Sequence, residues 1–290
     1  MKIGVIGTPG GWSSEQLADA VAGRTGRRIL ISPDEIRLDL PSGRACCGDH
    51  DLAGFDALLI KKIGARYSPD LLDRLEILRY LEGRGLKVFS SPLALLRVLD
   101  RLSCTITLQL AGIPMPPTTI TESVDHARDA LRGYGEAILK PLYTSKARGM
   151  VFIRDEPGAG DLIRAYKEKH SILYLQKRIP LGDRDLGVAF VGGEYLATYA
   201  RCRQGVAWDT ISDSKEKYRA FEPSPGVIEM ARRAQGLFNL SFTCVDVALT
   251  DDGPYVFEVS AFGGFRGILE TSGINAAERY VDHVLQRVSP

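Results

Sequence analysis

Residues 244–260 read Cys244-Val245-Asp246-Val247-Ala248-Leu249, then a turn, then Tyr255-Val256-Phe257-Glu258-Val259-Ser260. Both halves are typical of strands, and each carries one acid inside an apolar run. The turn, Asp251-Asp252-Gly253, fits a three-residue loop with the glycine in the left-handed position. That loop pairs Thr250 with Pro254. Counting back from there pairs Asp246 directly with Glu258, with Cβ atoms roughly 5 Å apart.

Two carboxylates in this position repel each other unless a positive charge lies between them. A divalent cation meets this requirement, because oxygen ligands favour a hard ion and Mg²⁺ often takes one or two carboxylates plus phosphate oxygens. Ser260 lies two residues beyond Glu258 on the same face and adds a hydroxyl. We therefore predict a metal site at Asp246, Glu258 and Ser260. The alternative is a register shifted by one residue, which places the acids on opposite faces.

The rest of the chain predicts a mixed α/β and α+β protein. In the first 90 residues, strands alternate with helices, which indicates a small parallel sheet covered by helices. The strands expected there are 2–6, 28–31, 57–60 and 86–89, and the helices are 13–22, capped by Ser13 or Ser14, and 70–82. Beyond Ser91-Pro92 we expect helices 93–100, 102–111, 123–131, 161–169, 226–238 and one from about 276, with strands 118–120, 137–140, 150–154, 172–176, a meander over 185–201 and the hairpin 242–259. Residues 202–222 read as a long polar segment, and Gly263, Gly264 and Gly267 as a lead into the last helix.

Composition narrows the class of protein. The chain has 290 residues, which at roughly 150 residues per domain suggests two domains. Its 37 basic and 36 acidic residues nearly cancel, which argues against a general nucleic-acid partner. A run of about 18 apolar residues is absent from the sequence, so we expect no membrane partner. The five cysteines lack any CxxC spacing, and a cytoplasmic protein is expected.

Several basic residues point to phosphate binding. Lys140 ends an apolar strand, where the alternative is that its side chain reaches out to solvent. The loop Thr144–Gly149 is small, polar and basic, and suits a flap over a triphosphate, although an ordinary hairpin loop is the alternative. Arg101 lies between two helices, where the alternative is a surface ion pair with Asp100.

The order of these motifs resembles the ATP-grasp superfamily, and most closely its RimK-like carboxylate–amine ligases. Ser90-Ser91-Pro92-Leu93 through Gly112-Ile113-Pro114-Met115-Pro116 is similar to that family's entry motif. Ala137–Leu142 resembles its phosphate-binding lysine strand, and Tyr174–Ile179 its adenine-binding linker. Val245–Val247 and Phe257–Ser260 resemble its two magnesium-binding strands, and the Gly-rich segment Ala261–Gly267 resembles the ATP-grasp member of the GAK gene cluster.

This resemblance implies an ATP-grasp fold, with an N-terminal α/β domain at 1–91 and an ATP-grasp domain at 92–290 whose two lobes are roughly 92–173 and 174–290. It implies ATP and Mg²⁺ or Mn²⁺ as cofactors. It also implies activation of a carboxylate as an acylphosphate, which an amine then attacks, with possible addition of a glutamate-like amino acid to a small molecule or peptide. The residues implied for ATP are Arg101, Lys140, Ser145, Lys146, Arg148, Gln176, Lys177, Arg178, Ile179 and Asp185. Those implied for catalysis are Arg201 and Arg266, and those for the substrate are Arg203, Trp208, Lys215 and Lys217.

Four positions depart from the family pattern. Arg101 stands where the family has a lysine, and Ser260 where it has an asparagine. The 143–149 loop has fewer glycines than usual. Gly187 stands where an arginine often follows the acid near the ribose, and this leaves the acceptor open. For Arg203, the alternative to substrate binding is a solvated strand end. For the polar segment 203–220, the alternative to a binding loop is a disordered excursion of the chain.

Two other classes of protein remain as alternatives. The turn Gly4-Val5-Ile6-Gly7-Thr8-Pro9-Gly10-Gly11 after the first strand suggests a nicotinamide oxidoreductase, but its spacing is not G-x-G-x-x-G. A non-catalytic ATP-binding sensor or scaffold is the second, because Ser260 and Arg101 depart from the family. The sequence leaves the substrates and any homo-oligomer undetermined.

Overall fold

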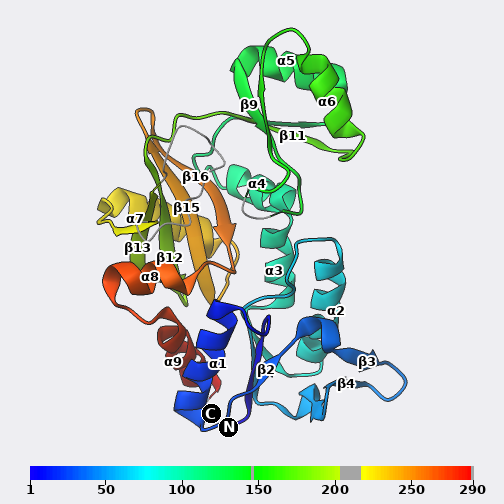
Figure 1. Ribbon diagram of the computed structural model, residues 1–290. Coiled ribbons are helices and arrows are strands. Elements are labelled where there is room, and N and C mark those ends of the chain that lie inside the picture. Colours follow the sequence, from blue (N-terminus) through cyan, green and yellow to red (C-terminus); the bar gives the residue numbers. More distant parts are fainter. Residues whose placement is uncertain (145–146, 203–216, 289–290) are drawn as a thin grey trace.

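The computed structural model describes residues 1–144, 147–202 and 217–288. It has the mixed architecture that the sequence predicts. A parallel sheet holds the N-terminus at one end, a five-stranded antiparallel sheet lies in the middle, and a four-stranded sheet with two helices lies at the far end (Figure 1). We call this last unit, residues 118–177, the small lobe.

The parallel sheet has the order β2-β1-β6-β7. Its strands are β1 (Ile3–Ile6), β2 (Leu30–Ile31), β6 (Ala57–Ile60) and β7 (Lys87–Phe89), accompanied by α1 (Trp12–Thr25) and α2 (Asp70–Gly83). Every residue of β1 and β6 is buried, as expected for strands covered on both faces. Helix α1 begins one residue earlier than predicted, with Gly11 and not a serine at its cap. Ser14 is buried instead, and its Oγ accepts a hydrogen bond from the backbone N–H of Thr8 at 3.1 Å.

A small antiparallel sheet between β2 and β6 was not predicted. It has the order β3-β4-β5, with β3 (Arg37–Asp39), β4 (Arg44–Cys47) and β5 (His50–Asp51), and single turns of 3₁₀-helix flank it at Pro33–Glu35 and Leu52–Gly54. The strands are two to four residues long and partly exposed. Segments this short carry too little alternation of apolar and polar residues for sequence reasoning to detect.

Helices α3 (Pro92–Leu99) and α4 (Arg101–Leu110) connect the parallel sheet to the small lobe. The sheet of the small lobe has the order β10-β9-β11-β8. Its elements are β8 (Thr118–Thr121), α5 (Val124–Tyr134), β9 (Glu136–Leu139), β10 (Val151–Arg154), α6 (Ala159–Lys167) and β11 (Leu173–Lys177). Each agrees with the predicted element to within a few residues.

The five-stranded sheet has the order β14-β13-β12-β15-β16. Its elements are β12 (Arg184–Val191), β13 (Glu194–Cys202), β14 (Tyr218–Ala220), α7 (Pro225–Gly236), β15 (Phe242–Thr250), β16 (Gly253–Ser260), α8 (Phe265–Ser272) and α9 (Ala276–Val288). Two of these correct the sequence analysis. Residues 218–220 form an edge strand inside the expected polar segment, and α8 replaces the expected lead-in to the last helix.

The β15–β16 hairpin reaches the predicted acid pairing by a different route. Thr250 pairs with Gly253 across a two-residue turn, so the predicted pairing of Thr250 with Pro254 is wrong. A β-bulge between Asp246 and Val247 then leaves Phe257 as an extra residue on β16. The bulge shifts the register by one residue, and Asp246 consequently pairs with Glu258.

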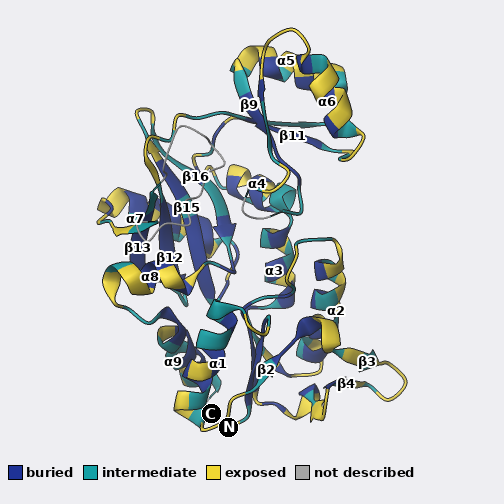
Figure 2. Cartoon of the chain, viewed as in Figure 1, coloured by how far each residue is buried: buried dark blue, intermediate teal, exposed yellow. Residues whose placement is uncertain are grey.

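Three groups of buried apolar side chains stabilise these sheets. Two of them combine the parallel sheet with the five-stranded sheet: Ile6 and Leu58 share one with Val245, and Ile3 and Val5 share the other with residues of β15, α8 and α9. The third consists of small-lobe residues only. Figure 2 shows the small lobe with its own buried strands and helix faces, separate from the buried strands of the other two sheets.

We predict that Gly187→Ala destabilises the protein. A Cβ at Gly187 would lie 2.5 Å from Cζ of Tyr199, a ring that is 4% exposed and cannot move away. Overpacking of this kind costs about 1–3 kcal/mol of unfolding free energy, measurable by urea denaturation. Gly133→Ala in α5 is the control, because its Cβ meets no atom of the described residues within 4 Å and a helical alanine should add about 0.5–1 kcal/mol. Equal stability of the two variants would contradict the packing described.

Candidate active site

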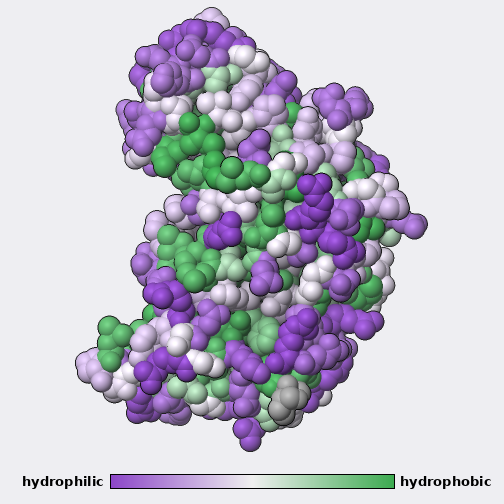
Figure 3. All heavy atoms as spheres, turned by 180° about the vertical axis from the view of Figure 1, so that it is seen from behind, coloured by the Kyte–Doolittle hydropathy of each residue, from purple (hydrophilic) through white to green (hydrophobic). Residues whose placement is uncertain are grey.

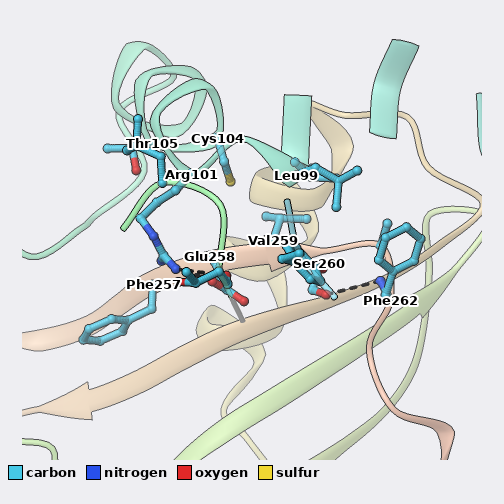
Figure 4. Close-up of a pocket in the computed structure, with 14 residues that line it drawn as sticks. Leu99, Arg101, Cys104, Thr105, Phe257, Glu258, Val259, Ser260 and Phe262 are labelled. Carbon is cyan, nitrogen blue, oxygen red and sulfur yellow. Dashed lines mark hydrogen bonds and ion pairs between the residues drawn. The ribbon is translucent and has the colours of Figure 1, made fainter. Parts of the chain in front are cut away.

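A cavity opens where the junction of α3 and α4 faces β16. Arg101 and Thr105 from α4, Glu258 and Ser260 from β16, and Thr144 from the loop after β9 line its wall. Figure 4 shows Arg101 extending from α4 toward Glu258. Thr144 Oγ1 is buried and has no hydrogen-bond partner among the described residues. The cavity therefore contains an unsatisfied polar atom of the kind that a bound ligand or water satisfies.

The acid pair lies at one end of a row of charges that crosses four strands, because β16 is the edge strand of the sheet. Asp246 pairs directly with Glu258. Arg201 on β13 approaches Asp185 with Nε at 2.5 Å from Oδ1, and Asp246 with Nη2 at 3.0 Å from Oδ1. Gly187 on β12 lies opposite Asp246, and it has no side chain that would obstruct the ion pair between Arg201 and Asp246. The structure thus brings together Asp185, Arg201, Asp246 and Glu258.

Burial is the main influence on the ionisation of Asp246. It raises the pKa of this carboxyl group, and the negative charges of Glu258 and Asp185 raise it further. Arg201 acts in the opposite direction, because its guanidinium favours the ionised form. A cation that bound both carboxylates would favour the ionised form in the same way. Deprotonation of Asp246 and metal binding would therefore be coupled.

Arg101 joins the site through its side chain. Asp100 is the N-cap of α4, and its side chain accepts a hydrogen bond from the N–H of Leu102 at 3.0 Å. The guanidinium of Arg101 turns toward Glu258 instead, with Nη1 at 3.5 Å from Oε2. It also donates to the backbone carbonyl groups of Pro141 at 3.0 Å and Thr144 at 3.4 Å. The alternative of an ion pair between Arg101 and Asp100 is therefore wrong.

Lys140 is buried beside the same cavity. Its Nζ donates to Oε1 of Gln176 and lies 5.1 Å from the ring centroid of Phe257, the residue that the β-bulge displaces. Gln176 is itself buried, and its Nε2 donates to Thr118 Oγ1 at 3.0 Å. Burial lowers the pKa of Lys140 to about 7, and Arg101 contributes in the same direction. An anionic phosphate next to Nζ would restore the charged form.

The acid pair and Ser260 fit a hard divalent cation. Among the described residues, no group of three or more His, Cys, Asp or Glu side chains could hold a metal. Two carboxylates and a hydroxyl remain, which agrees with the few protein ligands that Mg²⁺ usually takes. The Glu258 side chain is 45% exposed, so its oxygens are accessible. Ser260 Oγ accepts a hydrogen bond from the N–H of Phe262 at 3.2 Å, which leaves lone-pair density for a metal (Figure 4).

The structure does not bring the other predicted residues into this row of charges. Lys177 ends β11, followed by Arg178, which forms an ion pair with Glu136 at 2.6 Å, and by Ile179. Arg148 is exposed in the loop between β9 and β10. Arg266 lies toward the parallel sheet, where it stacks over the ring of Trp12. Lys217 precedes β14 at the edge of the five-stranded sheet, and its Nζ lies 5.5 Å from the ring centroid of Tyr218. Ser145, Lys146, Arg203, Trp208 and Lys215 lie outside the described residues.

Two residues of the site were missed from the sequence. Tyr67 follows β6 and lines the same cavity as Arg101 and Glu258. Burial raises the pKa of its hydroxyl, and the charge of Glu258 raises it further. The ring of Phe257 packs near Lys140 because of the bulge. No motif marks Tyr67, and a bulge leaves no signal in the spacing of apolar residues.

Comparison with known proteins assigns the family. Residues 98–284 match the RimK-like ATP-grasp domain. The chain is 27% identical to a tetrahydromethanopterin:alpha-L-glutamate ligase of Methanosarcina acetivorans, over 83% of each chain. It is 26% identical to a probable alpha-L-glutamate ligase of Maridesulfovibrio salexigens, over 100% of this chain and 97% of the relative. Its fold is similar to that of the ATP-grasp ligase PsnB, solved with a precursor variant, Mg and ADP, with a TM-score of 0.75, 17% identity and coverage of 99% and 98%.

The chain belongs to the RimK-like ATP-grasp family. It is an ATP-dependent carboxylate–amine ligase, in agreement with the opposed acids, the buried lysine and the fold.

Seen from behind, the surface is hollowed between the small lobe and the rest of the molecule, and apolar side chains gather along the edge of the lobe (Figure 3). No helix among the described residues is long and apolar enough to cross a membrane.

We predict that ATP binding without metal takes up a proton at pH 8. With a pKa of about 7, Lys140 is largely neutral in the free protein, and the ATP phosphates favour its charged form. Uptake should approach one proton per site, measured by isothermal titration calorimetry with EDTA in two buffers of different ionisation enthalpy. Lys140→Met should abolish it, whereas Lys177→Met at the end of β11 should not. Equal uptake in both variants would assign the proton to another group.

Proposed function

We propose that the chain attaches glutamate, or a similar amino acid, through its amine to the carboxylate of a small molecule or peptide. The observation that carries this proposal is the opposed pair Asp246 and Glu258, each with its own arginine, beside the buried Lys140. The relatives named alpha-L-glutamate ligases support the choice of glutamate. A reaction that consumes ATP favours a cytoplasmic protein.

Asp246, Glu258 and Ser260 would hold Mg²⁺, and Mn²⁺ suits the same oxygen ligands. The metal, when bound, neutralises charge on the phosphates. Arg101 and Lys140 would bind phosphate oxygens, together with Ser145, Lys146 and Arg148 of the loop after β9. The backbone of residues 176–179 would contact adenine, since the Gln176 side chain is engaged by Lys140 and Thr118. Asp185 would lie near the ribose.

The reaction would proceed in two balanced steps. An oxygen of the substrate carboxylate attacks the γ-phosphorus of ATP, and ADP leaves. The amine nitrogen then attacks the acyl carbon and loses a proton, and phosphate leaves. Arg201, fixed by Asp185 and Asp246, would stabilise charge on the acylphosphate, because a guanidinium donates two parallel hydrogen bonds. Arg266 would stabilise the same charge or bind the substrate carboxylate.

The residues that would bind the substrate are Arg203, Trp208, Lys215 and Lys217. We also propose a domain division at residue 91. The lobe boundary expected at 173 moves to residue 177, because β11 (Leu173–Lys177) belongs to the sheet of the small lobe. We infer that the N-terminal unit and the five-stranded sheet act as one body, because two apolar cores join them, and that ATP binds between this body and the small lobe.

We predict that Glu258→Gln reduces kcat at least 100-fold while the protein remains folded. The amide keeps the shape of the side chain but removes the negative charge that a divalent cation requires. ADP release is measured with Mg²⁺, glutamate and a panel of carboxylates. Asp252→Asn, in the exposed turn of the same hairpin, is the control and should keep full activity. Near wild-type activity of Glu258→Gln would exclude the metal site.

The same assay separates a ligase from an ATP sensor. A ligase releases ADP only when both a carboxylate and an amine are present. Tight ATP binding with no ADP release on any pair of substrates would identify the sensor.

A further inference from the structure

The crevice at the carboxyl end of the parallel sheet is the conventional place for a ligand. In open α/β sheets, ligands bind where the strand order reverses. The order β2-β1-β6-β7 puts this point between β1 and β6. The Gly-rich turn 7–11 follows β1, and Lys61 and Lys62 follow β6, with both of their N–H groups bonded to the carbonyl of Ile6. These residue types would suit an anion.

Lys61 does not reach toward solvent or an anion. It is 1% exposed, and its Nζ donates to the backbone carbonyl of Gly263 at 2.6 Å. Nζ lies 3.9 Å from the ring centroid of Phe265 and 4.9 Å from that of Phe242. A buried lysine is costly unless polar or aromatic partners compensate for lost hydration. Burial lowers the pKa of Lys61 well below its ordinary value, and the charge of Lys62 lowers it further.

Two further contacts hold the same segment against the parallel sheet. Lys62 Nζ donates to the carbonyl of Phe262 at 3.3 Å and lies 5.1 Å from the centroid of its ring. On the other side, the guanidinium carbon of Arg266 lies 4.9 Å from the ring centroid of Trp12, the first residue of α1. Figure 1 shows the beginning of α8 beside the beginning of α1. Residues 262–266 are thus held by Lys61 and Lys62 after β6 and by Trp12 at the start of α1.

This segment connects two parts of the active site. It begins two residues after Ser260, whose Oγ accepts the N–H of Phe262. It ends at Arg266 on the first turn of α8. Gly263 packs so closely that a Cβ there would lie 2.4 Å from Cβ of Cys244, two residues before Asp246. A shift of the segment would therefore move Ser260 and Arg266 together.

We propose that Lys61 is a positioning residue: at the switch point of the parallel sheet it binds the protein's own 262–266 segment in place of a ligand, and so fixes Arg266 relative to the metal strand. In this crevice, a contact between the N-terminal unit and the substrate side of the ligase therefore takes the place of a bound ligand. Its effect on catalysis rests on the proposed function, in which Arg266 serves the acylphosphate or the substrate carboxylate.

Lys61→Met tests this proposal, because it keeps the length and apolar body of the side chain but removes the donor. Lys2→Met is the matched control. Lys2 precedes β1, and its Nζ lies 4.2 Å from the ring centroid of Phe55, so that variant also removes a lysine–aromatic contact of the N-terminal unit, but not one with the 262–266 segment. Phe265→Leu is a second test variant that retains the lysine and removes one ring.

The first readout is hydrogen exchange measured by mass spectrometry, which requires no substrate. Amide exchange over 261–267 should become at least tenfold faster in Lys61→Met, less so in Phe265→Leu, and stay unchanged in Lys2→Met. Unchanged exchange in both test variants would overturn the proposal. So would a uniform increase over the whole sheet, since that indicates loss of general stability.

The second readout is a split of the kinetic constants. In Lys61→Met, we expect kcat/KM for the carboxylate and for the amino acid to fall roughly 10- to 100-fold, because a small misplacement of a reacting group has an effect of this size. KM for ATP should stay within twofold of wild type. An equal change in the kinetic constants for all substrates, ATP included, would contradict positioning of Arg266. If the wild-type protein releases no ADP on any pair, the proposed function fails, while the exchange experiment still decides whether Lys61 holds the segment.

Discussion

The structure depends on two negative charges, Asp246 and Glu258, that face each other on adjacent strands. Like charges in this arrangement destabilise a sheet, so positive groups must surround them. Arg201 and Arg101 supply these from opposite sides, one across β12 and the other from α4. The same repulsion would favour a divalent cation bound by both carboxylates. Each arginine also has another partner, so the site is pre-organised by contacts to Asp185 and to the 141–144 backbone.

Much of the site could be predicted from the hairpin sequence, but part of the argument was wrong. A glycine after two aspartates predicted a three-residue loop, whereas the chain turns in two residues and recovers the register through a bulge at Phe257. Both routes give the same pairing of Asp246 with Glu258. A bulge depends on contacts with neighbouring elements, here the packing of Phe257 near Lys140, and these are not visible in one strand.

The criterion that identified Lys140, a lysine at the end of a buried strand, applies equally to Lys61 after Ala57–Ile60. Only Lys140 was predicted on this ground. Helix α8 was missed because glycines at 263, 264 and 267 suggest a loop, yet the helix begins between them and Gly267 is required by the ring of Tyr199. Long periodic helices such as α2 and α5 depend on local pattern and were predicted accurately.

The small lobe is attached to the rest of the molecule in a way that affects how it can move. Its apolar core is its own, and the described contacts with α4 include hydrogen bonds from Arg101 to Pro141 and between Thr105 and Tyr174. Water can replace bonds of this kind at little net cost, whereas separating an apolar interface would be expensive. The joint therefore resists bending only weakly. A tilt of the lobe would break the bonds from Arg101 to the 141–144 backbone, so opening the site for a nucleotide would also loosen the arginine that faces Glu258.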